Sequence, residues 1–138
     1  MIEVRNVYKS FNGKEVLKDI SFTFEAGKTN LIIGQSGSGK TVLMKSVIGI
    51  HQVDKGQILY NGRDFTKMSS KDVAKLRQEI GMLFQGSALF DSMTVEENVR
   101  FPLEMFSDKT RKEWEKRVAF CLDRVGLSHA AKLFPSEI

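Results

Sequence analysis

The sequence predicts an α/β fold in three successive parts, and three observations predict it. Apolar and polar residues alternate in the first segment, 1–28. The glycine-rich stretch GQSGSGKT then lies between a short apolar run and a helical pattern. Two capping-box sequences open helical patterns after residue 86. We therefore expect one domain with an antiparallel β part at 1–28, a parallel α/β core at 29–85 and a helical part at 86–138.

The first part is predicted to form two strands. The segment MIEVRNVYKSF alternates and stops at NGK, which is a turn signal. The segment EVLKDISFTFEAGK follows, in which Ile20, Phe22 and Phe24 point to one side and the polar residues between them to the other. This pattern predicts a half-buried antiparallel pair.

The second part should contain buried strands, a helix and a hairpin. The runs TNLIIG and IGMLF are short and apolar, as in strands covered on both faces. KTVLMKSVIGI has a helical period. GQILYNGRDF predicts a hairpin at 57–65 around an Asn-Gly turn. SSKDVAKLRQE predicts a short helix capped by Ser69 or Ser70.

The third part should be helical. Thr94 and Glu97 form one capping box, and Thr110 and Glu113 form a second. Gly126 should stop the second helix. Its predicted apolar stripe consists of Trp114, Val118, Cys121, Leu122 and Val125.

Composition excludes several classes of protein. The net charge of +4 comes from 21 basic and 17 acidic residues that are interleaved, so we expect no nucleic-acid partner. No run reaches the roughly 18 apolar residues of a membrane span. The amino terminus lacks the apolar region of a signal peptide, which favours a cytoplasmic protein. The single cysteine, Cys121, allows no internal disulfide, and we expect it to be a small buried apolar residue.

The octet matches the pattern G-x-x-x-x-G-K-[ST] in full, in the strand–loop–helix context of a P-loop. Its glycines allow backbone N–H groups to converge on phosphate oxygens, helped by the positive end of the following helix. The lysine ammonium should reach the β- and γ-phosphates of a nucleoside triphosphate, and the threonine hydroxyl should bind Mg²⁺. The predicted ATP-binding residues here are Gly34, Gln35, Ser36, Gly37, Ser38, Gly39, Lys40, Thr41 and Val42.

Two other P-loop classes fit poorly. A GTPase would carry N-K-x-D, which is absent, and the D-x-x-G at 123–126 falls at a helix end. A nucleotide kinase would have its P-loop near the amino terminus and a visible lid.

The whole chain resembles the nucleotide-binding domain of ABC transporters. The resemblance places Phe11, in KSFNG, at the aromatic position that stacks on adenine, with Val16 beside the same base. From the residues alone, Phe11 could equally belong to the core. Gln85, at the end of GMLFQ, matches the Q-loop glutamine that contacts Mg²⁺. GMLFQGSALFDSMTVEENVRFPL and RVGLSHAAKLFPSEI look like the ATPase subunit of Mla-type, MCE-associated phospholipid transporters.

This resemblance implies a peripheral subunit on the inner face of the cell membrane that binds ATP and Mg²⁺. It implies a second nucleotide-binding subunit, arranged head to tail, and a membrane permease docked on the helical part. ATP hydrolysis by the full-length protein would drive transport of a phospholipid-like substrate. The alternative is a non-transport ATPase of the same family, of the cell-division or scaffold type, that uses dimerisation as a switch.

The 138 residues do not contain the family's hydrolytic apparatus. We find no Walker B carboxylates or switch histidine, so no catalytic residue is assigned, and His51 and His129 are expected to be surface residues. We therefore expect a truncated domain that binds nucleotide without useful hydrolysis. It should also self-associate or swap elements to cover its exposed strand edges.

Overall fold

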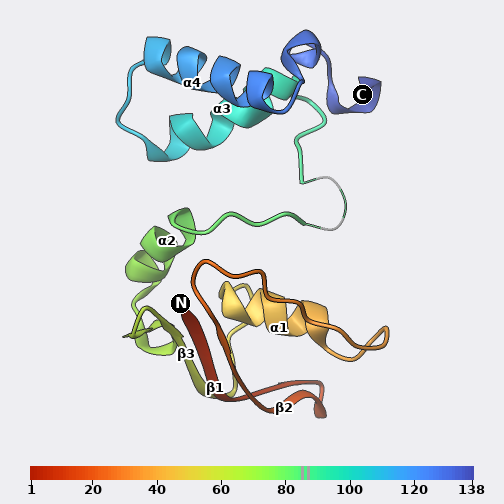
Figure 1. The fold of residues 1–138 in the computed structure, drawn as a ribbon, viewed down its shortest axis with the longest axis vertical. Helices are drawn as coiled ribbons and strands as arrows, with labels where there is room; N and C mark the ends of the chain where they lie inside the picture. The colour runs from red at the N-terminus through yellow and green to blue at the C-terminus, as the bar shows by residue number, and fades with distance from the viewer. Residues whose placement is uncertain (85, 87) are drawn as a thin grey trace. The chain divides into compact units, whose positions relative to one another are not determined.

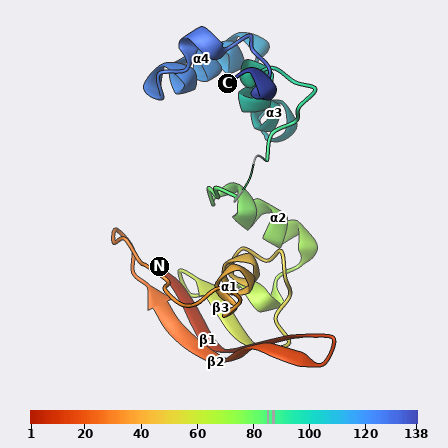
Figure 2. The same cartoon turned by 90° about the vertical axis from the view of Figure 1, so that its right-hand side faces the viewer.

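The computed structural model describes residues 1–84, 86 and 88–138, and it divides into two compact units, Met1–Met82 and Leu83–Ile138. The first unit joins a sheet to two helices, and the second is helical (Figures 1 and 2). None of the helices in the described residues is long and apolar enough to cross a membrane. The elements in chain order are β1 (Ile2–Phe11), β2 (Lys14–Phe24), α1 (Lys40–Val47), β3 (Lys55–Tyr60), β4 (Arg63–Asp64), η1 (Phe65–Lys67), α2 (Ser70–Gln78), α3 (Val95–Phe106), α4 (Arg111–Arg124), η2 (Ser128–Ala130) and η3 (Pro135–Glu137), where η marks a 3₁₀ turn.

The sheet is antiparallel, with strand order β2-β1-β3-β4. Both predicted turns are present: Asn12-Gly13 joins β1 to β2, Asn61-Gly62 joins β3 to β4, and all four residues have positive φ. Such turns match the twist of paired strands, which is why Asn-Gly predicts them. The hairpin at 57–65 pairs through β3 with β1, so it extends the amino-terminal sheet.

Helix α1 packs against this sheet through one apolar core (Figure 2). The core consists of Val4, Val7, Leu17, Leu43, Val47, Ile58, Tyr60, Phe65 and Leu76. The buried phenol of Tyr60 donates a hydrogen bond of 2.5 Å to the carbonyl of Val47. Strand β3 therefore holds the carboxyl end of α1.

The two buried strands predicted at TNLIIG and IGMLF are wrong for the described residues. Neither segment is a strand, and Leu31, Ile33 and Leu83 are 84%, 81% and 97% exposed. Ile32 and Ile80 still pack partly against the core. A strand needs a neighbour for its backbone hydrogen bonds, and the described residues place none beside these runs. The sheet that is present is accordingly antiparallel throughout.

The second unit packs α3 against α4 around Val95, Val118 and Leu122 (Figure 1). Both predicted helix starts are confirmed: the carboxylates of Glu97 and Glu113 accept from the backbone N–H groups of the capping threonines. The predicted α4 stripe is correct at its centre and too long at its end, because Val125 is 66% exposed.

The end of α4 explains this difference. Gly126, at φ +72°, turns the chain there, and Leu127 donates its N–H to the Leu122 carbonyl. Cys121 is half-buried, so its expected full burial is not reached.

Candidate functional site

The glycine-rich loop enters α1 at Gly39, which has φ +94° and is the first residue outside the helix. A Cβ at this position would lie 3.1 Å from Val16 Cγ1 and 3.3 Å from Leu17 Cδ2. An alanine here would meet both the strain of a positive φ and strand β2. Glycine at this position therefore lets the loop pass close to the strand.

Lys40 folds back across the loop. Its ammonium donates to the carbonyls of Gly34 and Gln35, at 2.6 and 2.7 Å. The Ser38 N–H also donates to the Gln35 carbonyl, at 3.2 Å. The two bonds from Lys40 use two of its three ammonium donors, so the cation is held at the loop and retains a further donor for a ligand.

The start of α1 differs from the starts of α2 and α3. It has neither a side-chain cap nor an acidic residue in its first turn. In α2 and α3, by contrast, the Ser69 and Thr94 hydroxyls accept from the backbone. Uncapped N–H groups and the positive end of the helix dipole favour an anion. Ser36, Gly37, Ser38 and Thr41 are exposed around this end, and Val42 is half-buried behind it.

The two residues predicted to contact the base lie in the same unit as the loop. Phe11 is the last residue of β1, is 39% exposed and is not a member of the core cluster. Val16 is half-buried in β2 and faces the loop at Gly39. These observations argue against Phe11 as a core residue, and they leave an exposed ring on which a base could stack.

Magnesium donors in the described residues are few. No group of three or more His, Cys, Asp or Glu residues that could hold a metal occurs outside positions 85 and 87. Thr41 offers one exposed hydroxyl beside Lys40. Such a donor fits Mg²⁺, which commonly keeps several waters and shares its coordination with substrate phosphates. The second predicted contact, Gln85, lies outside the described residues.

Sequence reasoning missed His51, which contacts Phe11, and Asp54, which bonds to Lys9 and Ser10 just before it. His51 was expected at the surface, but it is half-buried, and its ring meets the Phe11 ring edge-on at a centroid distance of 5.2 Å. Asp54 pairs with Lys9 at 2.7 Å, and the Lys9 ammonium lies 5.2 Å from the Phe11 centroid. Residues about 40 apart in sequence leave no local pattern that would reveal these contacts. His129 is exposed, as expected.

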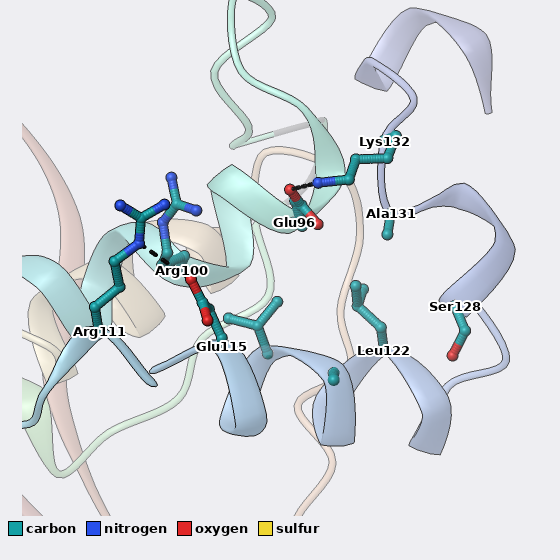
Figure 3. Close-up of a pocket in the computed structure, with 10 residues that line it drawn as sticks. Glu96, Arg100, Arg111, Glu115, Leu122, Ser128, Ala131 and Lys132 are labelled. Atoms are coloured by element: carbon teal, nitrogen blue, oxygen red, sulfur yellow. Dashed lines mark hydrogen bonds and ion pairs between the residues drawn. The ribbon is translucent and has the colours of Figure 1, made fainter. Parts of the chain in front are cut away.

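A separate cavity of about 310 Å³ lies within the second unit (Figure 3). Its apolar wall comes from α4 at Val118 and Leu122. Two ion pairs flank it, Arg111 with Glu115 and Lys132 with Glu96. The helical unit thus carries a hollow with an apolar wall and a charged rim.

Comparison with known proteins assigns the chain to a family. Residues 17–137 match the family model described as ABC transporter. The chain is 38% identical over 137 residues to "Probable ribonucleotide transport ATP-binding protein mkl" of Mycobacterium leprae (strain TN), covering 99% of this chain and 40% of that protein. It is 39% identical over 142 residues to "Methionine import ATP-binding protein MetN 1" of Pseudomonas syringae pv. syringae (strain B728a), covering 100% of this chain and 42% of that protein. The chain thus spans about 40% of the length of these curated relatives.

A solved structure agrees. The ATP-binding cassette MJ0796, described as dimeric in a post-hydrolysis state with ADP and Pi, superimposes with a TM-score of 0.88 at 25% identity. The match covers 100% of this chain and 63% of that one. Neither curated relative above is named for phospholipid transport, so the finer Mla-type resemblance is not confirmed. The chain belongs to the ATP-binding domains of the ABC transporter family.

Proposed function

We propose that this chain binds MgATP, with residues 34–42 around the phosphates and Phe11 and Val16 at the adenine. The observation that carries the proposal is the uncapped start of α1 with the Lys40 ammonium held beside it. A cation and free N–H groups at one helix end match the charge and geometry of a polyphosphate. The half-exposed Phe11 ring supports the place of the base.

Thr41, with Gln85, would hold Mg²⁺ together with phosphate oxygens. When bound, the metal ion neutralises charge on the β- and γ-phosphates. Thr41 would supply one oxygen ligand to the ion, and Lys40 would add a second positive charge nearby. We propose that these 138 residues alone bind the nucleotide but do not hydrolyse it at a useful rate.

In a longer protein, we propose that ATP hydrolysis drives transport through a membrane permease. The dimeric ATP-binding cassettes that superimpose on the chain support a second nucleotide-binding subunit as a partner. The helical unit, with its charged hollow, is the proposed contact with the permease at the inner face of the membrane. The proposed parts are 1–28 for the β subdomain, 29–85 for the P-loop core and 86–138 for the helical subdomain.

The identity of the transported substrate is the most specific part of this proposal. The resemblance of GMLFQGSALF to Mla-type ATPases implies a phospholipid, whereas the names of the relatives support ribonucleotide or methionine import instead. Substrate-stimulated ATP hydrolysis by the longer protein with its permease would decide among the three. Stimulation by methionine or a ribonucleotide, and none by phospholipid, would remove the phospholipid assignment.

The binding proposal is tested by Lys40→Ala. Loss of a charged hydrogen bond to phosphate, worth about 1.5–3 kcal/mol, should weaken binding of a fluorescent ATP analogue by about 10- to 140-fold. Lys45→Ala is the matched control, because Lys45 lies in the last turn of the same helix, away from the loop. Equal affinity of the Lys40 variant and wild type would contradict the phosphate assignment.

A further inference from the structure

Phe11, the proposed adenine platform, is held by side chains from the segment that joins α1 to β3. We propose that His51 and Asp54 are positioning residues that fix the Phe11 ring for the base and thereby strengthen binding of the adenine. The inference rests on the proposed stacking role of Phe11.

Asp54 fixes the backbone that leads into Phe11. Its two carboxylate oxygens accept from the Lys9 ammonium at 2.7 Å and from the Ser10 N–H at 2.6 Å. Its own N–H donates to the Tyr8 carbonyl at 2.9 Å. The regular pairing of β1 with β3 ends at Tyr8, so the Asp54 carboxylate bonds to the two residues beyond the end of that ladder.

The same carboxylate also places a cation on the ring. The Lys9 side chain is only 15% exposed, and its ammonium lies over the Phe11 ring at 5.2 Å from the centroid. The hydrogen bond from Lys9, with that from the Ser10 backbone, holds the pKa of Asp54 below its ordinary value, so the carboxylate is charged at neutral pH. A cation over one face of the ring is compatible with a base stacked on the opposite face.

His51 contacts the Phe11 ring in a T-shaped arrangement. The two ring planes meet at 73°, a T-shaped contact that limits rotation of Phe11 without occupying a face in parallel. The backbone of His51 is held in turn, because its N–H donates to the Lys45 carbonyl in the last turn of α1, at 3.2 Å. The first turn of α1 is part of the proposed phosphate site, so a single eight-residue helix connects the proposed base platform to the glycine-rich loop.

This arrangement predicts that substitutions of His51 and Asp54 weaken binding of the base and leave binding of the phosphates unchanged. We would measure displacement of a fluorescent ATP analogue by ATP and, separately, by inorganic tripolyphosphate with Mg²⁺. His51→Ala and Asp54→Ala should each weaken ATP binding by about two- to tenfold, as expected for loss of one aromatic or cation contact. Tripolyphosphate affinity should stay at the wild-type value. His129→Ala, at an exposed histidine of the helical unit, is the matched control.

Two further variants separate positioning from general packing. His51→Phe keeps an edge-on ring and should retain ATP affinity, whereas His51→Ala should not. In a Phe11→Ala background, neither His51→Ala nor Asp54→Ala should weaken ATP binding further, because both act through the Phe11 ring.

The outcomes are distinct. The inference is overturned if the ATP and tripolyphosphate affinities fall together, or if Phe11→Ala weakens ATP binding while both positioning variants bind as wild type. If Phe11→Ala itself binds ATP with wild-type affinity, the stacking role of Phe11 is wrong, and so is this inference. The phosphate site is then judged independently by Lys40→Ala.

Discussion

Replacing Gly49 by alanine should lower the free energy of unfolding of the first unit by about 1–5 kcal/mol. Gly49 lies in the turn after α1 at φ +74°, where a side chain costs about 1–2 kcal/mol. A Cβ there would lie 2.1 Å from Cζ and 2.7 Å from Cε1 of Phe65. The Phe65 ring is 8% exposed within the core, so it has little room to move, and overpacking should add about 1–3 kcal/mol. Reduced entropy of the unfolded chain returns about 0.4–1 kcal/mol.

Urea unfolding followed by far-ultraviolet circular dichroism measures this loss, with the midpoint and slope compared against wild type. Gly13→Ala is the matched control. Gly13 has a similar φ of +78° in the first hairpin, but a Cβ there would meet no atom within 4 Å. The control should therefore show the backbone strain without the clash. If Gly49→Ala loses no more stability than Gly13→Ala, the close approach of Phe65 to this turn is wrong.

Three other predictions concern the sheet, the loop and a helix cap. Tyr60→Phe should cost about 1–3 kcal/mol in thermal or urea unfolding, because the Val47 carbonyl loses its buried donor. Burial raises the pKa of Tyr60 to about 12, so as the pH rises the unfolded chain loses the phenol proton before the folded chain does. The free energy of unfolding of the wild type should therefore fall between pH 10 and pH 12, and that of Tyr60→Phe should fall less steeply. Gly39→Ala should weaken ATP binding in an equilibrium titration, because its Cβ would displace the loop from β2. The Thr94 backbone and hydroxyl hydrogen bonds lower the pKa of Glu97, so stability present at neutral pH should fade in acid, and Glu97→Gln should flatten that acid dependence in pH-dependent melts.

Much of the fold followed from local sequence. Asn12-Gly13 and Asn61-Gly62 need positive φ at both positions, and few other residue pairs accept it, so the turns could be predicted. The capping boxes at Thr94 and Thr110 are equally local, since the partners are three residues apart. The strands expected at TNLIIG and IGMLF failed because an apolar run predicts burial, whereas a strand also depends on a neighbour that the run does not specify.

The candidate site, too, could be predicted only in part from the sequence. The octet could be proposed as a phosphate site because such a site depends on consecutive backbone groups, and the resemblance to ABC domains indicated Phe11 as a candidate for the base. The contacts of His51 and Asp54 with the end of β1 could not be predicted. They join segments about 40 residues apart, and each residue alone reads as an ordinary polar side chain. The close approach of Val16 to Gly39 was likewise visible only once the sheet and loop were placed together.

Helix α1 is stabilised at one end and lacks a side-chain cap at the other, and this asymmetry suits it to the proposed role in phosphate binding. At its carboxyl end, Tyr60 and Arg77 donate to the carbonyls of residues 47–49, so groups that would otherwise lack partners are satisfied from β3 and α2. At its amino end, Gly39 supplies no side-chain cap, and the Lys40 cation is the nearest charged group in the loop. A helix of eight residues is marginal by itself, so its tertiary contacts must hold it. Because those contacts are concentrated at the carboxyl end, the N–H groups at the other end can remain free for phosphate without loss of the helix.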